Sequence, residues 1–152
     1  MSDERYETRL EWSGSTGAGW DSYGREHVAS APPAEQAVRL TTGEPHGDRS
    51  ILNPEQLVVM AAASCQMLMF LHLAAKARID VVSYSDESSG VMPADADPPR
   101  ITEIVLRPRI VVAGEASEKR LARLLELAHD HCYVANSLRG EVKIEPAFEI
   151  GG

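Results

Sequence analysis

The sequence contains two cysteines, Cys65 and Cys132, which are the side chains best suited to covalent or redox chemistry. The thiolate is the reactive form, whereas a cysteine with an ordinary pKa of about 8.5 is mostly protonated at neutral pH. Two cysteines are enough for one reversible disulfide. Free cysteine is also among the most buried residue types, so both could instead be small core residues. The two residues by themselves leave both interpretations open.

Other chemical patterns in the sequence are weaker. His129 and Cys132 are three residues apart on a predicted helix, a spacing that two metal ligands can share. Zinc needs three or four ligands, and the other candidates show no recognisable spacing: His27, His46, Cys65 and His72. There is no glycine-rich phosphate loop, no pair of catalytic carboxylates and no Ser-His-Asp arrangement. The sequence therefore predicts no metal and no cofactor.

The composition is that of one ordinary globular domain. The chain has 152 residues, 43% hydrophobic and 25% charged, and a net charge of −8. We therefore expect a single domain over residues 1–152. The negative charge and the lack of basic runs argue against nucleic acid or an anionic membrane as a partner. Residues 1–10 contain no apolar signal-peptide core, which predicts a cytoplasmic protein with reduced thiols.

The elements that must position the two cysteines can be predicted in part. β-forming residues at 6–12, 23–30 and 36–41 predict two or three antiparallel strands. Asn53 then reads as a helix N-cap, Pro54 as the first helical residue, and Glu55 as an acid in the first turn. A long helix should therefore begin near residue 54 and carry Cys65.

That helix is almost entirely apolar or small over residues 57–77, so it should be buried on all sides. A membrane span is the alternative for about 20 apolar residues, but polar residues near its centre and the missing aromatic belt oppose it. A domain of this size has difficulty wrapping such a helix alone. We therefore expect partner subunits to cover it, as in a homodimer.

The remaining chain should alternate between strands and one further helix. A β-type run covers residues 79–84, residues 92–100 form an exposed connection, and residues 101–112 read as one long strand with Pro108 at an edge or a bulge. Residues 117–131 form an amphipathic helix that leads to Cys132. Residues 141–150 alternate as a final strand. The predicted fold class is α+β.

Three segments together resemble the OsmC/Ohr family of thiol-dependent peroxidases (osmotically inducible protein C and organic hydroperoxide resistance protein). The resemblance rests on the helix start at residues 53–57 with Cys65 after it, on Ile79-Asp80-Val81, and on residues 132–142, where the second cysteine opens a short helix that ends at a glycine. It covers most of the chain. Arg25 occupies the position of an arginine in the family's N-terminal strands. Its flanking residues resemble a third, less characterised subgroup, and Tyr133 stands where a proline often follows the second cysteine.

The resemblance implies an OsmC-like fold and a two-cysteine mechanism, and the all-round apolar helix favours an intertwined homodimer. Cys65 would attack an organic hydroperoxide, and its sulfenic acid would condense with Cys132 to a disulfide, bringing their Cα atoms within about 7 Å. Arg25 would stabilise the Cys65 thiolate, and Glu55 would hold the guanidinium. A dithiol, such as a lipoyl group on a protein, would then reduce the disulfide. The apolar residues 67–70 suit an organic peroxide, although such a cluster also fits plain core.

Helix geometry constrains the role of Glu55. Ten helical residues span about 15 Å, so Glu55 should not touch Cys65 of its own chain directly. Either Arg25 spans this gap, or Glu55 reaches the Cys65 of a partner subunit. Two other functions stay open: an OsmC-fold stress-associated or small-molecule-binding protein with little or no turnover, and a thiol-disulfide exchange protein. The lack of a Cys-x-x-Cys motif argues against the exchange protein.

Overall fold

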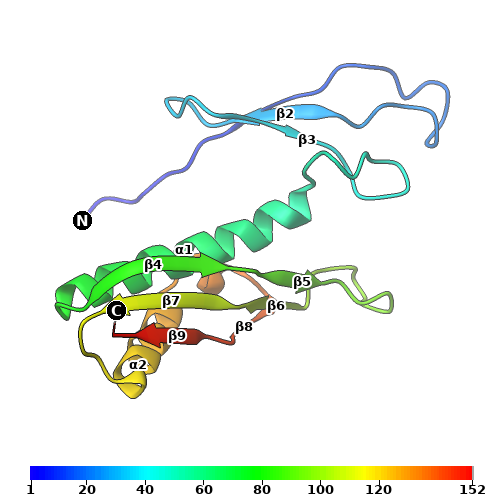
Figure 1. The fold of residues 1–152 in the computed structure, drawn as a ribbon. Helices are drawn as coiled ribbons and strands as arrows, with labels where there is room; N and C mark the ends of the chain where they lie inside the picture. The colour runs from blue at the N-terminus through cyan, green and yellow to red at the C-terminus, as the bar shows by residue number, and fades with distance from the viewer. Residues whose placement is uncertain (152) are drawn as a thin grey trace. The chain divides into compact units, whose positions relative to one another are not determined.

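The computed structural model describes residues 1–151, which form two compact units, one over residues 1–57 and one that starts at Val58 (Figure 1). The single-domain expectation stays a prediction. The first unit contains the antiparallel sheet β1(Arg9–Glu11), β2(His27–Ser30) and β3(Ala37–Leu40), in that order. All three strands lie inside the segments predicted from the sequence.

The long helix α1(Pro54–Lys76) begins where the sequence predicts. Asn53 Oδ1 accepts from the N–H of Gln56, and Gln56 Oε1 accepts from the N–H of Asn53, each at 2.9 Å. This reciprocal pair is a capping box, which satisfies N–H groups that a helix start otherwise leaves without partners. The sequence prediction had named Glu55 in the first turn but not Gln56.

The second unit contains two mixed three-stranded sheets. In the first, β7(Pro108–Ala113) pairs antiparallel with β4(Asp80–Asp86) and parallel with β9(Ala147–Ile150). In the second, β6(Glu103–Leu106) pairs antiparallel with β5(Ser89–Val91) and parallel with β8(Glu141–Ile144). The other helical elements are α2(Glu118–Asp130) and the 3₁₀ turn η1(Ala135–Ser137). The α+β class is confirmed.

The structure corrects two strand predictions. Residues 101–112 are not one long strand, because the chain leaves one sheet after Leu106 and enters the other at Pro108. The N–H of Arg107 donates to Asp86 Oδ1 at 2.8 Å, and proline has no N–H for a ladder. Residues 141–150 divide in the same way, with Pro146 between β8 and β9. The two breaks are adjacent, because β6 pairs in parallel with β8 and β7 pairs in parallel with β9.

Helices α1 and α2 lie on one face of the sheet β4-β7-β9, behind it in Figure 1. The main core cluster combines α1, β7 and α2 through Phe70, Ala74, Ile110, Val112, Leu121, Leu125 and Ala128. A smaller cluster joins the first half of α1 to β6 and β8 through Ala62, Ile104, Leu106 and Val142. The second unit is therefore built around α1.

Helix α1 is not buried on all sides within one chain. Its fully buried residues form a single stripe at every fourth position: Ala62, Gln66, Phe70 and Ala74. On other faces Met60 is 49% exposed and Leu68 is 61% exposed. Helix α1 is long and apolar enough to cross a membrane. Core helices of soluble proteins can have the same length and composition. Cover by a partner subunit stays a prediction.

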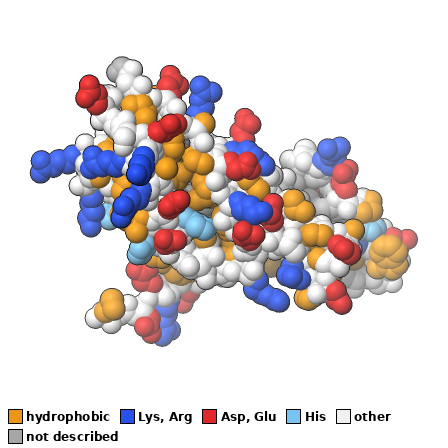
Figure 2. All heavy atoms as spheres, turned by 90° about the horizontal axis from the view of Figure 1, so that it is seen from below, with side chains coloured by type: hydrophobic (Ala, Val, Ile, Leu, Met, Phe, Trp, Pro, Cys, Tyr) orange, Lys and Arg blue, Asp and Glu red, His pale blue; other side chains and the backbone are white. Residues whose placement is uncertain are grey.

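Charges on the surface are mixed. Figure 2 shows acidic and basic side chains interspersed with hydrophobic ones on the face it presents. The ion pairs are exposed, as for Arg39 and Glu26 at 2.6 Å or Arg109 and Glu149 at 3.5 Å. Exposed pairs of this kind typically contribute about 0.2–1 kcal/mol. The stability of the fold therefore rests on the two apolar clusters.

Candidate active site

The two thiols come together in the second unit. Cys65 lies in the middle of α1, and Cys132 follows the last turn of α2. Both are free thiols, and Cys65 lies close enough to Cys132 to raise the pKa of the Cys132 thiol. Residues far apart in the sequence thus meet because α1 and α2 pack against each other in one core.

The two thiols have different environments. Cys65 is partly exposed, whereas Cys132 is only 1% exposed. Burial raises the pKa of the Cys132 thiol, the N–H of Ala135 lowers it through a 3.5 Å contact with Sγ, and the neighbouring Cys65 raises it. The net shift is upward, which keeps Cys132 protonated at neutral pH. Cys65 is the more accessible thiol of the pair.

A cavity of about 520 Å³ opens onto Cys65. One wall is the face of α1 that carries Ala61, Ser64, Leu68, Met69 and His72, and the other is formed by Tyr133 and Val134 just after Cys132. The lining is mostly apolar, and its ionisable side chains besides Cys65 are His72 and Tyr133. A cavity of this size falls in the range that binds small molecules.

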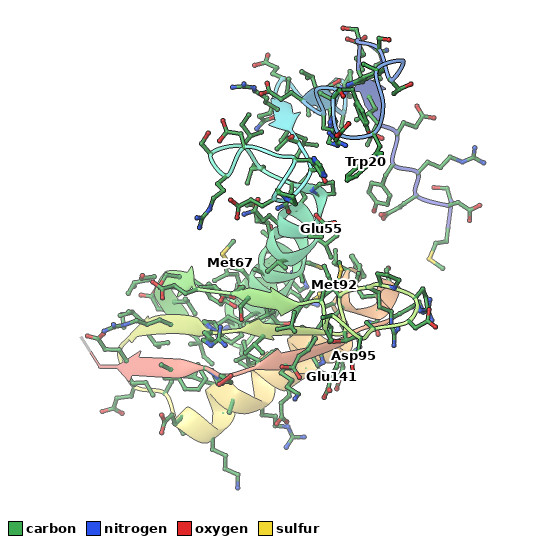
Figure 3. All side chains as sticks on the ribbon, turned by 90° about the vertical axis from the view of Figure 1, so that its right-hand side faces the viewer. Trp20, Glu55, Met67, Met92, Asp95 and Glu141 are labelled. Carbon is green, nitrogen blue, oxygen red and sulfur yellow. The ribbon has the colours of Figure 1, made fainter. Side chains whose placement is uncertain are left out.

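The apolar residues next to Cys65 divide into two groups. Leu68 and Met69 line the cavity, whereas Phe70 belongs to the buried core. Met67, labelled on α1 in Figure 3, is not part of the cavity lining. The sequence did not place Ser64, His72 or Tyr133 in a cavity beside Cys65. A signal was available, because Ala61, Cys65, Leu68 and His72 follow the spacing of one helix face.

Arg25 belongs to the first unit and is fixed there by local contacts. Its guanidinium donates to the carbonyl of Tyr23 at 2.9 Å and to the carbonyl of Trp20, and it lies over the Tyr23 ring at 4.0 Å. Stacking and carbonyl contacts hold the planar group in one orientation. The Arg25 guanidinium is therefore held in place, unlike that of an arginine whose side chain is fully exposed to solvent.

Glu55 is exposed in the first turn of α1, where Figure 3 labels it. Within residues 1–151 no ion pair joins Glu55 to Arg25. The structure thus brings Cys65 and Cys132 together, but it does not pair the two charged residues expected to assist them. Among the same residues, no group of three or more His, Cys, Asp or Glu side chains could hold a metal ion.

The family model for OsmC-like protein matches residues 46–147 of this chain. The chain belongs to the OsmC-like protein family. The matched region includes Cys65, Cys132 and all the elements of the second unit except the last residues of β9. The family indicated by the sequence is confirmed.

Solved OsmC-like structures share the fold. An OsmC-like protein of unknown function from Vibrio cholerae O1 biovar eltor superimposes with a TM-score of 0.86 at 27% identity, covering 95% of this chain and 100% of the other. An organic hydroperoxide resistance protein from Legionella pneumophila gives a TM-score of 0.67 at 20% identity, covering 97% and 99%. At 20% identity, the comparison with the Legionella pneumophila protein shows a shared fold only.

A relative in sequence also spans the whole chain. The uncharacterized protein YmaD of Bacillus subtilis (strain 168) is 21% identical over 158 residues, which cover 100% of this chain and 99% of that protein. OhrB of Bacillus subtilis, an organic hydroperoxide resistance protein, has the same fold with a TM-score of 0.60 at 16% identity, covering 95% and 98%. The OsmC-like fold therefore accommodates considerable sequence divergence.

Proposed function

We propose that this protein is a thiol-dependent peroxidase that reduces organic hydroperoxides to alcohols. The main support is the arrangement of the two thiols: Cys65 faces an apolar cavity, and Cys132 lies beside it, buried and protonated. Hydroperoxide resistance proteins with the same fold support the same chemistry. Its thiols require a reducing compartment, which fits a cytoplasmic location.

The reaction has two balanced steps. The Cys65 thiolate attacks one peroxide oxygen, the O–O bond breaks, and the leaving alkoxide takes a proton to become the alcohol. The sulfenic acid on Cys65 then condenses with the Cys132 thiol, forming the S–S bond and releasing water. An external dithiol, such as a dihydrolipoyl group on a protein, reduces the disulfide and is itself oxidised.

Arg25 is the proposed activating cation. Cys65 lies too far along α1 for the helix N-terminus to stabilise its thiolate, because that effect fades within the first turn. A guanidinium keeps its charge when buried and can donate to both the thiolate and a peroxide oxygen. Glu55 would orient this group, either within its own chain or across a dimer.

The proposed assembly is a homodimer in which a second copy covers the exposed apolar residues of α1. Met60 is 49% exposed and Leu68 is 61% exposed, so α1 presents large apolar side chains to solvent. Exposed apolar surface of this kind often marks a protein–protein interface. Met60→Glu should therefore weaken the dimer without touching the thiol cavity. Sedimentation at micromolar concentration tests this, and a wild-type monomer would contradict it.

The decisive experiment treats fully reduced protein with one equivalent of cumene hydroperoxide. The expected result is loss of two hydrogens by intact mass and of both free thiols, with formation of one equivalent of the alcohol. Cys132→Ser should stop at the sulfenic acid, which a sulfenic-acid-specific reagent such as dimedone traps. Cys65→Ser should not consume the peroxide.

Three results would contradict the proposed peroxidase. If Cys65→Ser consumed peroxide like the wild type, the reaction would not use Cys65. If the wild type consumed no peroxide and formed no disulfide, the protein would be a binding protein with little or no turnover. If disulfides reacted much faster than peroxides, it would be a thiol-disulfide exchange protein. Comparing hydrogen peroxide with cumene hydroperoxide tests the substrate class, because the apolar cavity should favour the larger, apolar peroxide.

A further inference from the structure

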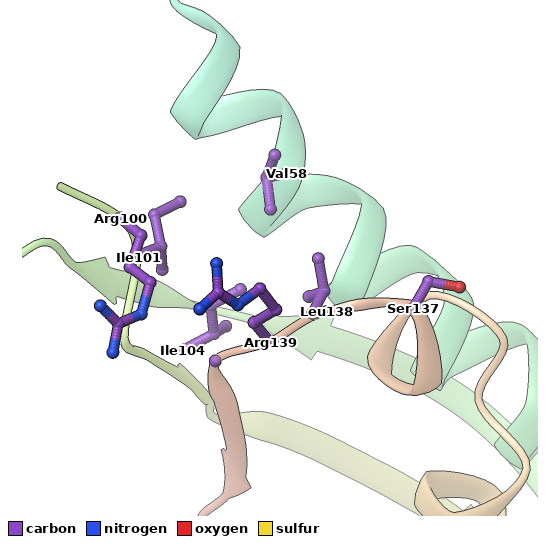
Figure 4. Close-up of a pocket in the computed structure, with 8 residues that line it drawn as sticks. Val58, Arg100, Ile101, Ile104, Ser137, Leu138 and Arg139 are labelled. Carbon is purple, nitrogen blue, oxygen red and sulfur yellow. The ribbon is translucent and has the colours of Figure 1, made fainter. Parts of the chain in front are cut away.

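A second cavity, of about 230 Å³, lies in the second unit and shares no lining residue with the cavity at Cys65. It is formed by the first half of α1, by residues 100–104 and by residues 137–140 at the end of η1 and after it (Figure 4). Val58, Ile101, Ile104 and Leu138 provide its apolar surface, and Arg100 and Arg139 add two positive charges. We refer to it as the two-arginine pocket.

The two arginines have few partners in the protein. Within residues 1–151 Arg139 makes no hydrogen bond and no ion pair, and Arg100 donates to the carbonyl of Pro98 at 3.3 Å. Figure 4 shows both arginines among the residues that line the pocket, on two different chain segments. Each has five N–H donors, so most of these donors are available to a ligand.

Among the described residues, no carboxylate lines the two-arginine pocket. Glu103 and Glu141 both pair with Lys143, at 2.7 and 4.0 Å. Asp95 and Glu141 lie at the end of the unit that faces the viewer in Figure 3, but neither lines the pocket. Within residues 1–151 neither Arg100 nor Arg139 forms an ion pair with a carboxylate. An anion bound in the pocket would neutralise positive charges that line the same cavity.

The backbone holds the two arginines at a defined spacing. A Cβ added at Gly140 would lie 2.7 Å from the carbonyl oxygen of Ile101 and 3.1 Å from that of Thr102, so only glycine allows this close approach. The next N–H, of Glu141, donates to the Thr102 carbonyl at 2.9 Å. Arg139 and Arg100 therefore sit on two segments that are fixed against each other, which lowers the entropic cost of binding.

We infer that the two-arginine pocket binds a small organic carboxylate with a short apolar tail. The guanidinium groups match a carboxylate in charge and hydrogen-bonding geometry. The tail would lie against Val58, Ile104 and Leu138. Because ligand cavities for drug-sized molecules are usually about 300–1,000 Å³, this smaller pocket suits a short aliphatic chain or one aromatic ring. The site is independent of the thiols and of any peroxidase activity.

Binding of hexanoate to the reduced full-length protein tests this inference, followed by calorimetry or by shifts of backbone NMR signals. We expect saturable binding with the largest shifts at residues 100–104 and 137–140. Hexanamide, which lacks the charge, and acetate, which lacks the tail, should each bind at least about tenfold more weakly. Equal affinity for acetate and hexanoate, or for inorganic phosphate and hexanoate, would overturn the inference, because only charge would then matter.

Arg100→Gln and Arg139→Gln should each weaken hexanoate binding about tenfold. Arg123→Gln is the matched control, because it removes the same charge from an exposed position on α2 outside the pocket. Circular dichroism verifies that each variant folds. Wild-type affinity in both pocket variants, or equal loss in Arg123→Gln, would contradict the inference. So would a lack of hexanoate binding together with dissociation of an oligomer by Arg139→Gln, because a second copy would then occupy the pocket.

Discussion

The buried side chain of Gln66 donates from Nε2 to the backbone carbonyl of Leu125 at 3.0 Å, which links α1 directly to α2. Gln66 is fully buried and is the residue next to Cys65, while Leu125 lies two turns before Cys132 on α2. The oxygen of the same amide, Oε1, is buried without a hydrogen-bond partner. A polar residue thus fixes the two helices that carry the thiols, within an otherwise apolar core.

The first prediction concerns the volume of this side chain. Gln66→Ala leaves a cavity between α1 and α2 and should lower the free energy of unfolding by about 2–4 kcal/mol. Gln66→Met fills the same space. It loses one hydrogen bond but also removes the unpaired Oε1, so the change should stay within about 1.5 kcal/mol. Urea unfolding of both variants measures the difference, and equal losses would show that packing is not the main contribution.

The second prediction concerns access to the two thiols. Cys132 is almost fully buried, and its pKa is raised by burial. Cys65 lines an open cavity. At about pH 7.5 iodoacetamide should therefore alkylate Cys65 at least about tenfold faster than Cys132. Peptide mass spectrometry at short reaction times measures both rates. Equal rates in the native protein would contradict the assignment, and equal rates in urea serve as the control.

The third prediction concerns stability at alkaline pH. Because the pKa of Cys132 is higher in the folded than in the unfolded chain, the unfolded chain loses its proton first as the pH rises. Stability contributed by this group is complete below about pH 8.5 and is lost above it, with a slope of at most about 1.4 kcal/mol per pH unit. Cys132→Ala should reduce this loss between about pH 8 and 9.5. Cys65→Ala should leave most of it, since burial is the main cause. An unchanged slope in Cys132→Ala would refute the shift.

Local signals in the sequence were sufficient for many elements of the fold. The start of α1 could be predicted because Asn53 and Pro54 act within one turn of the chain. The N-cap of α2 is equally local: the N–H of Arg120 donates to Ser117 Oγ at 3.1 Å. Such signals do not depend on tertiary contacts, so they can be interpreted from the sequence alone.

Features that depend on distant contacts could not be predicted in this way. The break between β6 and β7 depends on Asp86, which accepts from the N–H of Arg107 across 21 residues. The proximity of Cys65 to Cys132 depends on the packing of α1 against α2 and entered only through a family resemblance. The two-arginine pocket combines residues from three separate segments. No local pattern in any one of them indicates the others.

The fourth prediction tests the proposed role of Arg25. If its guanidinium stabilises the Cys65 thiolate, Arg25→Gln should slow the reaction of Cys65 with cumene hydroperoxide by roughly 100-fold. Arg25→Lys keeps the charge but loses the planar donor pair, so an intermediate rate is expected. Arg39→Gln is the control, because Arg39 is an exposed arginine of the same unit paired with Glu26. Stopped-flow measurement of single-turnover oxidation separates this step from reduction. Wild-type rates in Arg25→Gln would exclude the role.

The fifth prediction concerns the end of α1. The N–H of Ile79 donates to the carbonyl of Ala74 at 2.9 Å, and that of Arg78 donates to Ala75 at 3.1 Å, which is the Schellman pattern. Arg78 adopts a φ of 58°, a region that glycine usually occupies at this position. Arg78→Gly should therefore raise the free energy of unfolding by about 0.5–1 kcal/mol, because the steric cost of a left-handed L-residue exceeds the added flexibility of glycine in the unfolded chain.

Arg78→Ala separates the backbone effect from the charge. It removes the guanidinium but keeps the Cβ, so its stability should remain close to that of the wild type. Urea unfolding of the three proteins at one fixed protein concentration gives the comparison, since a dimer would make stability depend on concentration. If Arg78→Ala were stabilised as much as Arg78→Gly, the side chain of Arg78 rather than its left-handed backbone would be unfavourable at the end of α1.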